Sequence, residues 1–143
     1  MKAFPYVIEN SNKPSDMSVA ILLITHEHIG HNMLKIAGSI LNDDPKNIAC
    51  IEIPMDSDIS TMKQKIGNAL DSLASDEGVL ILADSYGSTP FNIATEFIDQ
   101  KKSTLVSGLN LPMLIRIMNY RLLPLDELKN IAIDGGRRGI TTI

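Results

Sequence analysis

The chain has 143 residues, 44% of them apolar, and a formal net charge of −4. This length suits one domain with a normal core, and the acidic balance argues against nucleic-acid binding, which needs a basic face. No segment reaches the length of a membrane span, and the first residues lack a secretory apolar core. The single cysteine, Cys50, lies in the apolar run 48–53 and is interpreted as a buried thiol in a reducing cytosol.

Strand and helix patterns alternate after a polar, aperiodic segment at 1–17, which is interpreted as a flexible leader or an alternative start. Residues 18–143 are expected to form a single domain. The predicted strands are 18–24, 47–53, 78–83 and 103–109, and the predicted helices are 30–41, 58–74, 90–100, one after Pro112, and 125–134. Gly135 and Gly136 are expected to end the last helix, and 139–143 to form a short terminal strand.

The strands at 18–24 and 78–83 are continuous apolar runs, as expected for strands covered on both faces in a parallel sheet. Alternating strands and helices with right-handed crossovers predict a doubly wound, mainly parallel α/β sheet. In the flavodoxin-like order 2-1-3-4, the first and third strands are neighbours at the topological switch point, where ligands bind. His26 follows the first strand and Asp84 follows the third, so we expect them to face each other across that crevice.

The segment after Asp84 predicts a binding site for an anion. Thr89 and Pro90 are interpreted as the N-cap and first position of a helix, whose free N–H groups and dipole favour negative charge. If Asp84 accepts one ring N–H of His26, it fixes the tautomer and leaves the other nitrogen as a nucleophile. His26 and Asp84 are therefore the predicted catalytic pair. The residues expected to hold the phosphoryl oxygens are Ser85, Tyr86, Gly87, Ser88 and Thr89.

These residues also have plainer interpretations. His26 could be an exposed turn residue, and Asp84 could be a capping carboxylate. His26 and His28, with Glu27 or His31, could bind a metal ion. Residues so close in sequence cannot surround an ion tetrahedrally without a distant ligand, so we expect no metal site.

Two further segments have a possible relation to the predicted site. Residues 110–112 close the fourth strand and are expected to shape a turn there. Arg137 and Arg138 could reach a phosphate, although the helix dipole explains a basic pair at a helix C-terminus equally well.

Three motifs together resemble the IIA component of the mannose/fructose/sorbose-type sugar phosphotransferase system. They are Ile-Thr-His at 24–26, Asp-Ser-Tyr-Gly-Ser-Thr-Pro-Phe-Asn at 84–92 and Gly-Leu-Asn-Leu-Pro-Met-Leu at 108–114, and the resemblance covers about residues 18–143. It implies that the phosphocarrier HPr phosphorylates His26, which passes the group to a histidine on a IIB partner without a cofactor. It also implies a cytoplasmic homodimer in which the C-terminal strand crosses to the other subunit's sheet, and membrane contact only through permease subunits.

The chain departs from this family's pattern at three positions. The family usually has Gly where Glu27 stands, often Gly or Ala at Ser88, and commonly Trp at Tyr86. Glu27 adds a negative charge that could alter which partner docks, whereas Ser88 adds a hydroxyl donor. Three functions fit the residues: a phosphohistidine carrier in sugar uptake, a regulatory domain whose phosphorylation state another protein reads, and a mononucleotide or flavin binder. The last fits least well, because the turn has no run of glycines.

Overall fold

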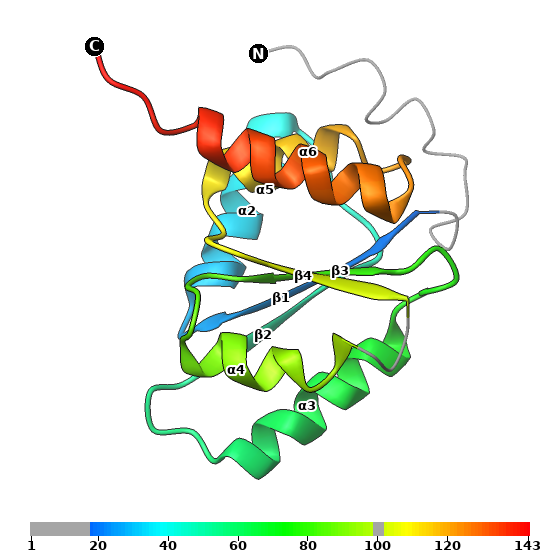
Figure 1. The fold of residues 1–143 in the computed structure, drawn as a ribbon, viewed down its shortest axis with the longest axis vertical. Helices are drawn as coiled ribbons and strands as arrows, with labels where there is room; N and C mark the ends of the chain where they lie inside the picture. Colours follow the sequence, from blue (N-terminus) through cyan, green and yellow to red (C-terminus); the bar gives the residue numbers. More distant parts are fainter. Residues whose placement is uncertain (1–17, 99–101) are drawn as a thin grey trace.

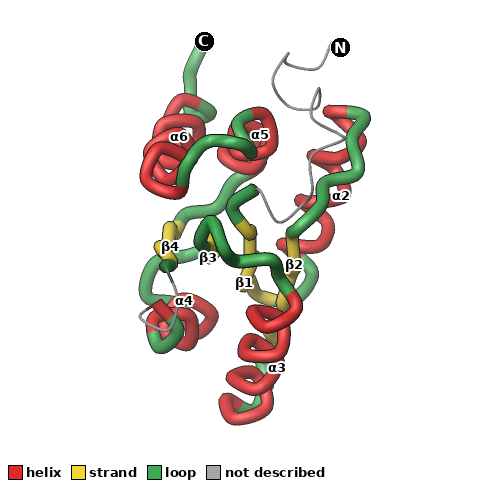
Figure 2. Tube along the Cα trace, turned by 90° about the vertical axis from the view of Figure 1, so that its right-hand side faces the viewer, coloured by secondary structure: helices red, strands yellow, loops and turns green. Residues whose placement is uncertain are grey.

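The computed structural model describes residues 18–98 and 102–143, which form three layers with a parallel sheet between two layers of helices (Figure 1). The strands are β1 (Ala20–His26), β2 (Ile48–Ile53), β3 (Val79–Ala83) and β4 (Ser103–Ser107), and the helices are α2 (Ile29–Leu41), α3 (Ile59–Ser72), α4 (Thr89–Thr95), α5 (Leu111–Asn119) and α6 (Leu125–Arg138). Helices α2, α5 and α6 cover one face of the sheet, and α3 and α4 cover the other (Figure 2). The strand order β2-β1-β3-β4 confirms the predicted doubly wound α/β fold.

Strand β1 lies inside the sheet and pairs in parallel with β2 on one side and β3 on the other. Ile24 of β1 is level with Ala83, the last residue of β3, and His26 is level with Ile53, the last residue of β2. The carboxyl ends of all three strands therefore meet at one edge of the sheet. This register puts His26 beside the residue that follows β3, which is Asp84.

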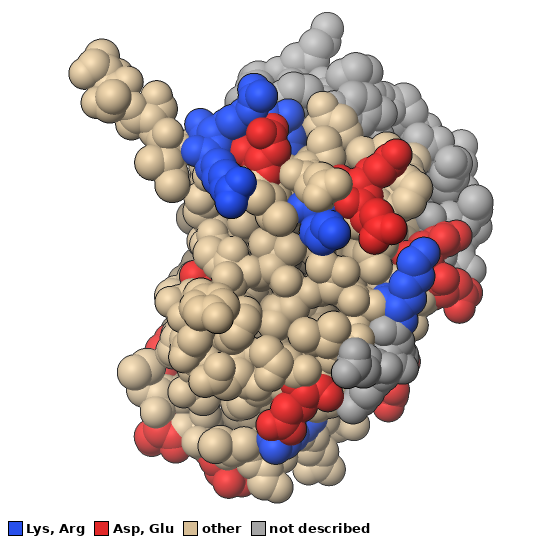
Figure 3. Space-filling view, in the orientation of Figure 1, with Lys and Arg blue, Asp and Glu red and all other residues tan. Residues whose placement is uncertain are grey.

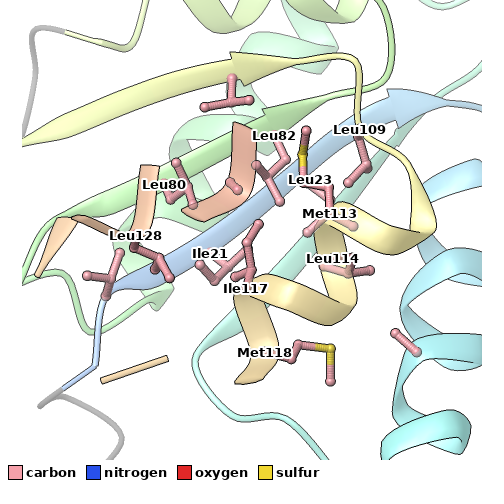
Figure 4. Close-up of a cluster of buried hydrophobic side chains, with 14 of the residues drawn as sticks. Ile21, Leu23, Leu80, Leu82, Leu109, Met113, Leu114, Ile117, Met118 and Leu128 are labelled. Carbon is pink, nitrogen blue, oxygen red and sulfur yellow. The ribbon is translucent and has the colours of Figure 1, made fainter. Parts of the chain in front are cut away.

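Alternate residues of the central strands are buried in two separate clusters, one on each face of the sheet. Strand β1 shows no alternation of apolar and polar residues, because helices cover both of its faces, and every residue from 20 to 24 has no exposed surface. Each such Leu or Ile side chain stabilises the fold by about 1.5–3 kcal/mol. Figure 4 shows the cluster beneath α5 and α6, which includes Ile21, Leu23, Leu80, Leu82, Met113, Leu114, Ile117 and Leu128.

Side chains cap the two helices that follow the edge strands. Asp58 precedes α3, and its carboxylate accepts hydrogen bonds from the Thr61 hydroxyl at 2.7 Å and from the Thr61 backbone N–H at 3.1 Å. These bonds, the hydroxyl bond first, lower the pKa of the Asp58 carboxyl. Asn110 precedes α5, where its Oδ1 accepts from the Met113 N–H at 2.9 Å.

The last helix is longer than the sequence predicted. Gly135 and Gly136 do not end it, because α6 continues to Arg138. Both glycines face α5, and a Cβ added at Gly135 would lie 2.7 Å from the Cβ of Arg116. These glycines therefore permit close helix packing, and the prediction that they terminate the helix is wrong.

The C-terminal tail, residues 140–143, forms no strand within the described chain and extends away from the domain (Figure 1). Ile140 is 79% exposed. The expected exchange of this tail between subunits remains a prediction.

Helix α4 is shorter than predicted. The backbone N–H groups of Glu96 and Phe97 bond to carbonyls three residues back, so the helix tightens and ends near Thr95. The end of the predicted helix, residues 99 and 100, and the segment 1–17 lie outside the described residues. In the ranges that are described, no helix is both long and apolar enough to cross a membrane.

Candidate active site

His26 and Asp84 lie in contact at the carboxyl ends of β1 and β3. The Asp84 Oδ2 atom accepts a hydrogen bond from the His26 backbone N–H at 3.1 Å and lies 2.8 Å from Nδ1 of the same residue. The Asp84 side chain is 9% exposed and that of His26 is 27% exposed. An ionised carboxylate only accepts hydrogen bonds, so Nδ1 carries the hydrogen of the neutral ring and Nε2 carries its lone pair.

The residues on either side of His26, Thr25 and Glu27, anchor the turn that follows β1 through their side chains. Thr25 is buried, and its hydroxyl oxygen accepts from the Gly30 N–H at 2.9 Å. A Cβ at Gly30 would lie 2.7 Å from the Sγ of Cys50, so only glycine fits this close approach of α2 to the sheet. Glu27 has a φ of +42°, which is in the left-handed region that favours glycine. Its carboxylate accepts from the Met55 N–H at 2.7 Å and so ties the turn to the loop after β2.

A second histidine of this turn contacts a different carboxylate. His28 Nδ1 lies 2.8 Å from Oε2 of Glu52, which belongs to β2. Sequence reasoning missed Glu52 as the partner of His28, because only the parallel register of β1 and β2 brings the two together. His26 and His28 are thus held by carboxylates on opposite sides of β1. Across the described ranges, no three His, Cys, Asp or Glu side chains are arranged to hold a metal ion.

Helix α4, which follows the turn after β3, begins one residue earlier than predicted. Ser88, not Thr89, is the N-cap: its backbone is extended, and its hydroxyl accepts from the Phe91 N–H at 3.3 Å. The same hydroxyl donates to the Ser85 carbonyl at 2.7 Å and thereby closes the turn. Thr89 is the first helical residue, and Pro90 follows it as a buried residue that needs no intrahelical N–H partner.

Tyr86 and Gly87 form the tip of this turn. Gly87 has a φ of +75°, and no atom would contact a Cβ placed there, so its requirement for glycine is conformational. Tyr86 is 80% exposed, and its ring centroid lies 4.8 Å from that of Phe91. The turn therefore presents an aromatic side chain and backbone groups to solvent beside Asp84.

The third sequence motif, residues 108–114, lies where β4 leaves the sheet and α5 begins. The Leu109 N–H donates to the carbonyl of Ala83 at 3.0 Å, which fixes the exit of β4 against the exit of β3. Asn110 caps α5, and its Nδ2 donates to the Gly136 carbonyl at 3.1 Å. Its contacts are structural, and none of them reaches His26.

Arg137 and Arg138 lie in the last turn of α6, where they complement the helix dipole. Figure 3 shows basic side chains gathered beside the C-terminal tail. Arg138 Nε contacts the carboxylate of Asp134 at 3.0 Å, so this arginine has a partner on its own helix.

Comparison with known proteins places the chain in the class of sugar phosphotransferase-system proteins. A family model described as "PTS system fructose IIA component" matches residues 20–131, and the chain belongs to this family. IIA components are phosphotransferases that work through a phosphohistidine intermediate. The resemblance inferred from the three motifs is confirmed.

Two curated relatives and one solved structure show the extent of the similarity. The chain is 30% identical over 130 residues to the mannose-specific EIIAB component of Escherichia coli K12, covering 89% of this chain and 40% of that protein. It is 29% identical over 89 residues to the fructose-specific EIIA component of Bacillus subtilis 168, covering 62% of this chain and 61% of that protein. The chain thus spans less than half the length of the EIIAB relative. The mannose/sorbose-specific IIA subunit of Enterococcus faecalis matches the fold with a TM-score of 0.80 at 25% identity, over 88% of this chain and 95% of that chain.

Proposed function

We propose that the chain is a phosphohistidine carrier in which His26 accepts a phosphoryl group and passes it on. The observation that carries this proposal is the contact between Asp84 and Nδ1 of His26 at 2.8 Å. It leaves Nε2 with its lone pair available, as a nucleophile requires. His26 is partly exposed while Asp84 is buried, so a partner protein can reach the ring but not the carboxylate that orients it.

The proposed step transfers a phosphoryl group between two nitrogens. The Nε2 lone pair of His26 attacks phosphorus in a phosphohistidine of the donor, and a new N–P bond forms as the donor's N–P bond breaks. The bonding electron pair returns to the donor's ring nitrogen. The hydrogen on Nδ1 of His26 stays in its bond to Asp84, which stabilises the positive charge that develops on the ring. Transfer to the next protein reverses these roles.

The turn from Ser85 to Thr89 is proposed to hold the phosphoryl oxygens. It contains no lysine or arginine, so its donors are backbone N–H groups and side-chain hydroxyls. Neutral donors orient a phosphoryl group that must later leave, whereas an arginine clamp would bind it more tightly. Such a site suits a carrier.

The family membership supports HPr as the donor and a IIB component as the acceptor, and we expect the chain to act in the cytoplasm. The names of its relatives include mannose, fructose and sorbose, but the sugar of this chain is not identified by them. A regulatory role, in which another protein reads the phosphorylation state of His26, uses the same residues. Neighbouring genes for IIB and membrane subunits distinguish the two roles, since a regulatory domain needs no cognate permease.

Labelling with phosphoenolpyruvate, enzyme I and HPr tests the proposal. The chain should acquire one acid-labile, base-stable phosphoryl group. His26→Ala should abolish it, while His28→Ala and His31→Ala should still be labelled. Label that persists on the His26→Ala protein would contradict the assignment.

A further inference from the structure

The contact between His28 and Glu52 repeats the geometry of His26 and Asp84. In both pairs a carboxylate oxygen lies 2.8 Å from Nδ1, which leaves Nε2 unengaged by that carboxylate. The pairs differ in exposure, because the His28 side chain is 75% exposed and that of His26 is 27% exposed. His28 is therefore an oriented imidazole at the solvent side of the turn that carries His26.

The edge of the sheet around His26 is rich in carboxylates. The described segments 25–32, 54–58, 84–90 and 107–111 contain no lysine or arginine, and Arg137 of α6 lines a groove with Ser107, Gly108 and Asn110 on the β4 side of this edge. These segments contain Glu27, Asp56, Asp58 and Asp84, and Glu52 lies at the end of β2 beside them. An arriving phosphoryl group, itself an anion, meets like charge here.

Glu27 follows His26 in the chain, and its bond to the Met55 N–H holds the carboxylate at the turn rather than leaving it free in solvent. The side chains of segment 25–32 that can become positive are histidines. His26 must be neutral to attack, and His31 lies on the next turn of α2 in a separate groove with Lys35 and Asp44.

We propose that protonated His28, oriented by Glu52, offsets the charge of Glu27 and so favours the approach of the phosphoryl donor to His26. This role rests on the proposed function of His26. His28 acts through its charge and takes no phosphoryl group itself. When the ring is protonated, His28 and Glu52 form an ion pair, and the net charge of this part of the edge becomes less negative by one.

The proposal predicts that part of the pH dependence of the transfer rate comes from His28. The charged and titratable groups around it are Glu52 on β2, Glu27 in its own turn, His31 on α2, Asp56 after β2, and the His26–Asp84 pair. His26 and these carboxylates remain in a His28 variant, so the ratio of wild-type to variant rates isolates the contribution of His28.

The experiment measures the rate of phosphoryl transfer from phospho-HPr at low ionic strength. At about pH 6, His28→Gln should react about threefold more slowly than wild type, and this difference should shrink at about pH 8, because the protonated fraction of a histidine falls as the pH rises. His28→Lys, which keeps a positive charge at both pH values, should restore the rate at pH 6 and exceed wild type at pH 8. His31→Gln is the matched control and should not differ from wild type.

A double-mutant cycle identifies the charge that His28 offsets. Glu27→Gln keeps an oxygen that can accept from the Met55 N–H but removes the negative charge. In that background the effect of His28→Gln should be smaller, because the carboxylate whose charge His28 offsets is no longer charged. An equal effect in both backgrounds, or no effect of His28→Gln at pH 6, would overturn the proposal while labelling of His26 still stands. Loss of label specificity for His26 would instead overturn the proposed function.

Discussion

One oxygen of Asp84 holds both the backbone and the ring of His26. Oδ2 makes the contact to the backbone N–H and the contact to Nδ1, whereas Oδ1 is buried with no partner among the described residues. The same oxygen therefore orients the ring and fixes the end of β1. Position and tautomer of His26 depend on one side chain.

Asp84→Asn should slow phosphoryl transfer strongly while leaving the fold intact. The amide removes the charge that stabilises the ring as a cation, and its NH₂ group can donate to Nδ1, which would move the ring hydrogen to Nε2 and block the nucleophile. Hydrogen bonds to charged groups are worth about 1.5–3 kcal/mol, so transfer should slow by roughly one to two decades. Rapid-quench kinetics with phospho-HPr measures the rate, and thermal unfolding checks the fold. An unaltered rate would leave Asp84 with a structural role only.

Because Ser88 rather than Thr89 caps α4, substitutions at these two positions should change the stability of the fold by different amounts. Ser88→Ala should cost about 1 kcal/mol of unfolding free energy, because the Phe91 N–H loses its side-chain acceptor. Thr89→Val should cost less, since Thr89 is the first helical residue and its hydroxyl caps nothing. Urea unfolding measures both.

A second variant at Ser88 tests where the phosphoryl group lies. Ser88→Asp retains a capping oxygen, so its stability should stay near wild type, but it adds a negative charge to the proposed phosphoryl turn. Its transfer rate should fall, whereas Ser88→Ala should transfer at a rate closer to wild type. If Ser88→Asp transfers normally, the phosphoryl oxygens do not lie against this turn.

The alternation of strands and helices predicted the fold because the apolar runs of β1 and β3 are long and unambiguous. The pairing of His26 with Asp84 followed from that fold alone, since parallel strands end at a common edge. Element ends were less predictable. Glycine often ends a helix, but Gly135 and Gly136 lie inside α6, where they pack closely against Arg116 and Met113 of α5.

Contacts between strands were the least predictable part of the site. Positions 28 and 52 share no local pattern, and their contact depends on the register in which Thr25 pairs with Glu52. The N-cap of α4 was ambiguous for a different reason: Ser88 and Thr89 both carry hydroxyls, and a proline is tolerated at either of the first helical positions. Only the three-dimensional structure distinguishes these alternatives.

Cys50 should be nearly inert in the folded protein. Burial, and then the Glu52 carboxylate, raises the pKa of its thiol to about 12. Alkylation by iodoacetamide at about pH 8 should therefore be at least about a hundredfold slower than in the urea-unfolded chain, because the thiolate is the nucleophile. Since the folded pKa is raised, this thiol favours folding below about pH 9, and the contribution declines as the pH rises toward 12. Rapid alkylation of the native chain would show that Cys50 is accessible.

The edge strand β4 could pair with the C-terminal tail, residues 140–143, of a second copy of the chain. Strand β4 ends the sheet, and a groove of about 430 Å³ runs between it and α6, lined in part by Leu105, Ser107, Ile133 and Ile140. Few charged side chains lie between α6 and α4 on the face seen in Figure 3. An unpaired strand edge tends to acquire a partner, and exchange of a terminal segment is a low-cost route to a dimer.

The intact chain should therefore be a dimer with twice the monomer mass of 15.7 kDa, held together by exchanged tails. Deleting residues 140–143 should produce monomer or aggregate, because it exposes the edge of β4 in each subunit without shortening α6. Ile140→Asp should weaken the dimer for the same reason, whereas Ile36→Asp, at a half-exposed position on α2, serves as the control and should remain dimeric. Light scattering across a range of concentrations measures each mass. A stable, monodisperse monomer of the intact chain would rule out the exchange, and a truncated chain that still dimerises would show that another surface holds the subunits together.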